Sequence, residues 1–127
     1  MVKQRILVVD DNEQVLEMAR DALEKAGYEV LTAGNGVEAD SYIFSKNRPD
    51  LMILEVMQPM LDGREKARLL REKGSSGPIP VLLISSKSED ELRLLAIEAG
   101  ADGYIRKPFT SAGIVAGVRE FMARISR

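Results

Sequence analysis

Five side chains suited to metal or phosphoryl chemistry each stand at the end of a short apolar run or just beyond it. They comprise three acids, one hydroxyl and one amine: Asp10, Asp11, Glu55, Ser85 and Lys107. Three carboxylates in one pocket repel one another, so cations must offset their charge. Lys107 supplies one positive charge, and a divalent ion such as Mg²⁺ suits hard oxygen ligands. Together these groups meet the needs of phosphoryl transfer, whose transition state spreads negative charge over oxygen atoms.

The elements that must position these side chains follow from hydropathy. Short apolar runs predict strands at residues 5–9, 28–33, 51–56, 81–84 and 104–105. Segments of helical spacing predict helices at about 12–26, 37–45, 64–73, 88–99 and 111–124. The fourth helix has a capping-box signature, with Ser88 as N-cap and Glu91 three residues later. The last helix is expected to bury six apolar residues: Ile114, Val115, Val118, Phe121, Met122 and Ile125.

Five strand–helix repeats predict an α/β fold with one parallel sheet and helices on both faces. In such open sheets, functional sites usually lie beyond the carboxyl ends of the strands, near the switch in strand order. The five chemical side chains converge there if the first, third, fourth and fifth strands are neighbours.

Length and composition narrow the classes of protein. The chain has 127 residues, so we expect a single domain over 1–127. It has no Cys and no His, which excludes thiolate zinc sites, Cys nucleophiles and Ser-His-Asp triads. A net charge of −2 leaves no broad basic face for nucleic acid, and no apolar run reaches the length of a membrane helix. We therefore expect a cytoplasmic protein that binds neither nucleic acid nor membrane.

Most of the chemical residues also have a purely structural interpretation. Asp10, Asp11 and Asn12 can cap the first helix, and Ser85 can bond to nearby backbone. Lys107 precedes a proline and can be a surface turn residue. Glu55 is harder to explain in this way, because an acid at the end of so apolar a strand is costly unless it is paired. The conjunction at four strand ends favours a functional site.

With these residues in place, the chain resembles a response regulator receiver domain of the CheY-like family over essentially its whole length. Four segments carry the resemblance: ILVVDDN (6–12), PDLMILEVMQPMLDG (49–63), PVLLISS (80–86) and GADGYIRKPF (100–109). It implies a flavodoxin-like sheet of order 2-1-3-4-5 with five helices. It also implies a non-enzymatic module of two-component, or phosphorelay, signalling. The implied partners are a histidine kinase, a phosphotransfer protein, another receiver or a second copy of the chain.

The resemblance implies a role for each matching residue. Asp10 and Asp11 match the acidic pair that holds Mg²⁺, and Met57 matches the position whose backbone carbonyl completes that site. Ser85 and Lys107 match the groups that contact the phosphoryl group. Two further matches concern conformation: Tyr104 aligns with the aromatic switch, and Pro108 with a proline that usually follows a cis peptide.

The decisive departure from the family is Glu55, which stands where the family has its phosphoacceptor aspartate. The extra methylene moves the carboxylate about 1.5 Å outward, and an ångström of misplacement costs roughly 100-fold in rate. Glu55 is therefore a mimic of the phosphorylated state, the mark of a phosphorylation-independent partner-binding module, or a slow acceptor. It also weakens the expected Mg²⁺ site, because Lys107 can pair with Glu55 directly. A metal-dependent phosphohydrolase is the alternative from another class.

Overall fold

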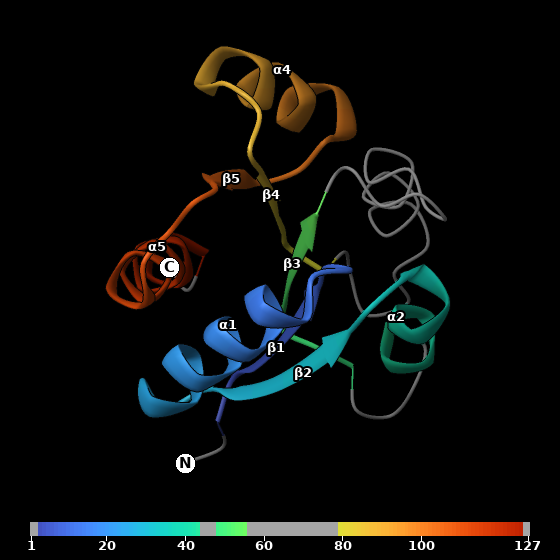
Figure 1. Cartoon of the computed structure of the whole chain (residues 1–127), viewed down its shortest axis with the longest axis vertical. Coiled ribbons are helices and arrows are strands. Elements are labelled where there is room, and N and C mark those ends of the chain that lie inside the picture. Colours follow the sequence, from blue (N-terminus) through green and yellow to red (C-terminus); the bar gives the residue numbers. More distant parts are fainter. Residues whose placement is uncertain (1–2, 44–47, 56–78, 126–127) are drawn as a thin grey trace.

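A single parallel sheet organises the part of the chain described by the computed structural model, residues 3–43, 48–55 and 79–125. Its strands are β1 (Arg5–Val9), β2 (Glu29–Ala33), β3 (Leu51–Glu55), β4 (Val81–Ser85) and β5 (Gly103–Arg106). The described helices are α1 (Glu13–Lys25), α2 (Gly36–Ile43), α4 (Glu89–Ala99) and α5 (Ser111–Ile125). The strand order is β2-β1-β3-β4-β5 (Figure 1). The predicted α/β fold and the strand order implied by the resemblance are confirmed.

Alternation along the strands divides the core into two layers. One set of strand side chains, including Leu7, Met52 and Leu83, packs with buried residues of α2 and α4. The alternate set, including Ile6 and Ile53, packs with α1 and α5. Every residue of β3 and β4 is buried, as expected for parallel strands covered on both faces.

Side-chain caps fix where two helices begin. Asn12 precedes α1, and its Oδ1 accepts hydrogen bonds from the backbone N of Gln14 at 2.9 Å and of Val15 at 3.3 Å. Ser88 precedes α4, and its Oγ accepts a bond from the N of Glu91 at 3.2 Å, which confirms the predicted N-cap. The Asn12 cap matters for function because it holds the turn that directly follows β1.

Some boundaries and burial predictions differ from the structure. Ser85 is the last residue of β4 rather than a residue beyond it, and β5 extends one residue further at each end than predicted. Ile125 was expected in the core but is 42% exposed, because it lies in the last turn of α5. Val115 is only half-buried. The predicted helix at 64–73 lies outside the described residues. Among the helices that are described, none is both long and apolar enough to cross a membrane.

Candidate functional site

The carboxyl ends of β1, β3 and β5 bring together two acids and one amine. Asp10 directly follows β1, Glu55 ends β3, and Lys107 directly follows β5. The Nζ of Lys107 lies 2.7 Å from Asp10 Oδ2 and 2.6 Å from Glu55 Oε2. The Asp10 side chain is fully buried, and those of Glu55 and Lys107 are 8% and 19% exposed. We call these three residues the carboxylate–lysine cluster.

The electrostatics of the cluster favour a permanently charged amine. Burial alone would lower the pKa of Lys107. The close contacts with the negatively charged Asp10 and Glu55 outweigh burial and raise the pKa of Lys107 above its ordinary value of 10.5. The ammonium therefore stays charged at neutral pH. Buried carboxylates are tolerated when they are paired in this way, and removal of one partner leaves an uncompensated charge.

Two hydrogen bonds position Asp10 in addition to its contact with Lys107. Its Oδ1 accepts a hydrogen bond from the N of Asn12 at 2.9 Å, and its own N donates to the carbonyl of Ala33 at 3.1 Å. Its Oδ2 is buried and has no well-aligned hydrogen-bond donor among the described residues, although Lys107 Nζ is close. The contact between Asp10 and Lys107 is therefore an ion pair whose alignment is poor for a hydrogen bond.

Ser85 lies at the end of β4, and a backbone hydrogen bond joins it to Lys107 of the cluster. It is fully buried, and its Oγ accepts a hydrogen bond from the N of Lys87 at 3.1 Å. Its carbonyl accepts a bond from the N of Lys107 at 2.8 Å, which fixes the backbone of Lys107 beside β4. The peptide between Lys107 and Pro108 is cis, as the resemblance implied. The hydroxyl of Ser85 thus bonds to nearby backbone, as its structural interpretation proposed. The same residue is bonded through its carbonyl to Lys107, which carries the amine of the cluster.

Tyr104 contacts α4. It lies on β5 and is half-buried, and its hydroxyl donates a 2.7 Å hydrogen bond to Glu89 Oε1 in the first turn of α4. This contact between residues 15 positions apart links β5 to α4. The sequence offered no signal for it, because it depends on how α4 packs against the sheet.

The predicted magnesium ligands do not assemble into a set of three acids. Asp11 is exposed, and Met57 lies outside the described residues. Within the described ranges, no group of three or more acidic side chains is placed to hold a metal ion. The oxygens of Asp10 and Glu55 are of the type that Mg²⁺ prefers, but the ammonium of Lys107 already contacts one oxygen of each. In this arrangement the cluster does not fit a divalent cation.

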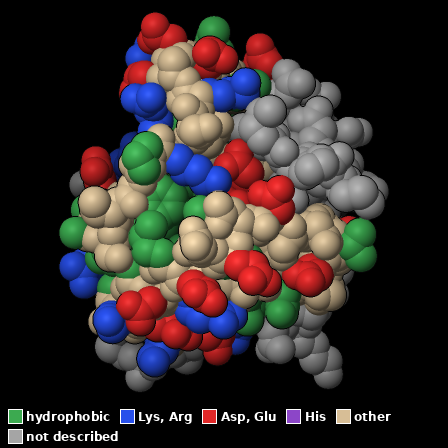
Figure 2. All heavy atoms as spheres, in the orientation of Figure 1, with side chains coloured by type: hydrophobic (Ala, Val, Ile, Leu, Met, Phe, Trp, Pro, Cys, Tyr) green, Lys and Arg blue, Asp and Glu red, His purple; other side chains and the backbone are tan. Residues whose placement is uncertain are grey.

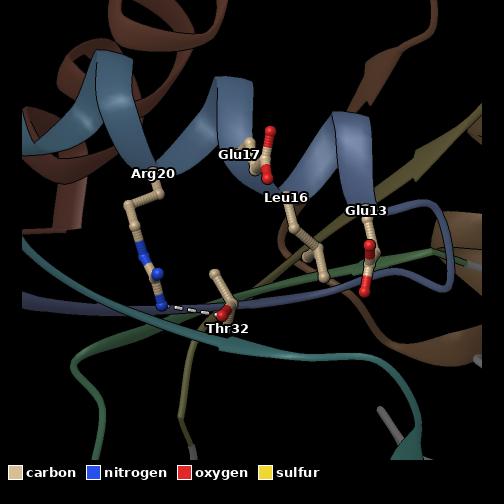
Figure 3. A pocket seen from close by; sticks show the side chains of 5 residues that line it. All are labelled: Glu13, Leu16, Glu17, Arg20 and Thr32. Carbon is tan, nitrogen blue, oxygen red and sulfur yellow. Dashed lines mark hydrogen bonds between the residues drawn. The ribbon is translucent and has the colours of Figure 1, made fainter.

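A surface pocket that the sequence did not predict lies between α1 and β2 (Figure 3). It is lined by Glu13, Leu16, Glu17, Arg20 and Thr32. Arg20 extends from α1 toward β2 and donates a 2.8 Å hydrogen bond to Thr32 Oγ1. None of its lining residues belongs to the carboxylate–lysine cluster. Among the described residues on the face shown in Figure 2, acidic and basic side chains are interspersed and form no extended basic surface.

Comparison with known proteins shows that the chain matches a known family. Residues 6–119 match the response regulator receiver domain family. The chain is 42% identical over 122 residues to the response regulator MprA of Mycobacterium sp. (strain KMS), covering 96% of this chain and 52% of that protein. It is 39% identical over 124 residues to the phosphate regulon transcriptional regulatory protein PhoB of Pseudomonas aeruginosa, covering 98% and 54%. The chain thus spans about half the length of these curated relatives.

Solved structures of response regulators have the same fold as this chain. The chemotaxis response regulator CheY4 of Vibrio cholerae superposes with a TM-score of 0.86 at 28% identity, covering 94% of this chain and 99% of that one. DrrB, an OmpR/PhoB homologue of Thermotoga maritima, superposes with a TM-score of 0.83 at 31% identity, covering 97% and 54%. The first superposition spans nearly all of both chains.

Proposed function

Because the chain belongs to the response regulator receiver domain family, we propose that it is a signalling receiver whose output does not require phosphorylation of an aspartate. The observation that carries this proposal is the contact of 2.6 Å between Glu55 and Lys107. Glu55 ends β3, where the resemblance puts the acceptor aspartate, and it is buried. Its carboxylate is held by an internal partner and is not free to attack a phosphoryl donor.

Two forms of this proposal follow from the length of the glutamate side chain. The carboxylate of Glu55 reaches about 1.5 Å further than that of an aspartate, toward Lys107. A phosphoryl group on an aspartate would place negative oxygens in that same direction. Glu55 therefore either mimics the phosphorylated state or marks a domain that binds partners whatever its phosphorylation state. Both forms predict that phosphorylation adds little to the output.

The proposed function also implies binding partners and a cellular location for the chain. Response regulators receive phosphoryl groups from histidine kinases, and receiver domains are signalling modules rather than enzymes. We propose that residues 1–127 form one such cytoplasmic receiver domain. Its proposed partner is a kinase, a phosphotransfer protein, another receiver or a second copy. The proposed surface comprises α4, β5 and α5, where Tyr104 already links β5 to Glu89. Mg²⁺ binding is proposed to be weak.

A direct test is exposure of the protein to a small acyl phosphate donor with Mg²⁺, followed by intact-mass measurement. We expect the mass to remain that of the unmodified chain, because Glu55 is misplaced for in-line attack and paired with Lys107. A conventional receiver with an aspartate acceptor, treated in parallel, shows that the donor is active. A stoichiometric gain of one phosphoryl group mapped to Glu55 would refute the proposal.

A further inference from the structure

We infer that Lys107 is the resident cation of the acidic pocket, and that its ammonium is what keeps a divalent cation from binding there. The inference rests on the proposed function and deepens it, since it names the cause of weak Mg²⁺ binding. It predicts that removal of the amine turns the residues Asp10 and Glu55 into a divalent cation site.

The contacts of the cluster carry the first step. The ammonium lies 2.6 Å from one oxygen of Glu55 and 2.7 Å from one oxygen of Asp10. Mg²⁺ would need carboxylate oxygens at about 2.0–2.1 Å, so it would compete for the same two side chains. Both carboxylates are at least nine-tenths buried, where repulsion between two neighbouring cations is poorly screened. A divalent ion that binds these two oxygens therefore has to displace the ammonium.

The anchoring of Lys107 makes its ammonium a strong competitor. Its backbone N donates to the carbonyl of Ser85 at 2.8 Å, so the chain holds the start of the side chain beside the pocket. A cation tethered in this way acts at a high effective concentration, whereas Mg²⁺ must be drawn from solution. This asymmetry explains how one monovalent group can exclude a divalent ion from two carboxylates.

The contacts of Asp10 indicate which negative charges remain in the pocket when the ammonium is removed. Its Oδ2 is buried without a well-aligned hydrogen bond from the described residues, and Lys107 is its charged neighbour. Without Lys107, the carboxylates of Asp10 and Glu55 keep their negative charges and lose the ammonium that contacts both of them. Two such charges match one divalent cation, and Mg²⁺ commonly completes its shell with water.

The test compares the chain with its Lys107→Met variant in a titration with Mg²⁺ and with Mn²⁺. Thermal melting reports stabilisation by the ion, and electron paramagnetic resonance of free Mn²⁺ counts bound ions directly. We expect the melting temperature of the unaltered chain to change little with millimolar Mg²⁺. The variant should melt at a temperature that rises with the ion and falls again with a chelator, with an affinity about tenfold or more above that of the unaltered chain.

A matched control is Lys87→Met, which removes the same charge from a residue near the pocket. The Nζ of Lys87 is 3.7 Å from Glu91 in a partly exposed pair and does not belong to the cluster. This control should bind ions as the unaltered chain does. If Lys107→Met does not fold without metal, the titration uses the Lys107→Gln variant instead. In addition, Lys107→Met is refolded in the presence of Mg²⁺. Tight Mg²⁺ binding by the unaltered chain, or folded Lys107 variants that bind no better, would overturn the inference. Phosphorylation of Glu55 would instead overturn the proposed function, so the two failures are distinguishable.

Discussion

The Lys107→Met variant is expected to lose about 3 kcal/mol of its free energy of unfolding in the absence of divalent cations. Removal of one partner from a buried ion pair typically costs about 3–5 kcal/mol, because it leaves a charge without compensation. Here two carboxylates lose their common partner, Asp10 being fully buried and Glu55 8% exposed. The lower end of the range applies because Lys107 itself keeps 19% of its side chain exposed.

Urea unfolding at neutral pH measures this loss as a shift of the midpoint at constant slope. The control is again Lys87→Met, whose partly exposed pair with Glu91 predicts a loss below about 1 kcal/mol. Equal, small losses in both variants would mean that the carboxylates of the cluster do not depend on Lys107.

The Glu55→Asp variant is expected to gain the ability to accept a phosphoryl group. The shorter side chain draws the carboxylate back from Lys107 by about 1.5 Å and returns it to the position implied for a family acceptor. An aspartate oxygen can then attack the phosphorus of an acyl phosphate while the donor's carboxylate departs. Because misplacement by an ångström costs roughly 100-fold, we expect phosphorylation at least about 100-fold faster than in the unaltered chain.

Intact-mass measurement after exposure to the donor and Mg²⁺ checks this gain. Glu55→Gln is the matched control, because it keeps the length of the glutamate and removes the nucleophilic carboxylate. It should remain unmodified. If the folded Glu55→Asp variant also stays unmodified beside an active reference receiver, residue 55 does not stand at the acceptor position.

Much of the fold could be predicted from local patterns. The strand at 5–9 was predicted with the same bounds as β1, because a compact β-branched run is followed directly by two aspartates. The start of α4 followed from the capping-box residues Ser88 and Glu91. The order of the strands came from the family resemblance, since hydropathy alone does not determine which parallel strands are neighbours.

Side-chain pairing in the site was less predictable. The strand ends indicated which residues would converge, and competition by Lys107 for Glu55 was foreseen. The simultaneous contact of Lys107 with Asp10 was not, because it depends on the register of β1, β3 and β5 and on the path of the Lys107 side chain. The bond between Tyr104 and Glu89, and the pocket beside Arg20, likewise depend on how helices pack against the sheet.

The central claim is that Lys107 and Glu55 stabilise each other in the folded chain, and a double-mutant cycle tests it most directly. The cycle compares the unfolding free energies of Lys107→Met, Glu55→Gln, the double variant and the unaltered chain. Residues in direct contact typically show coupling of about 0.5–3 kcal/mol, and we predict at least about 1 kcal/mol for this buried pair. Additivity of the two substitutions within about 0.5 kcal/mol would contradict the claim, because it would mean that Glu55 is not held by Lys107.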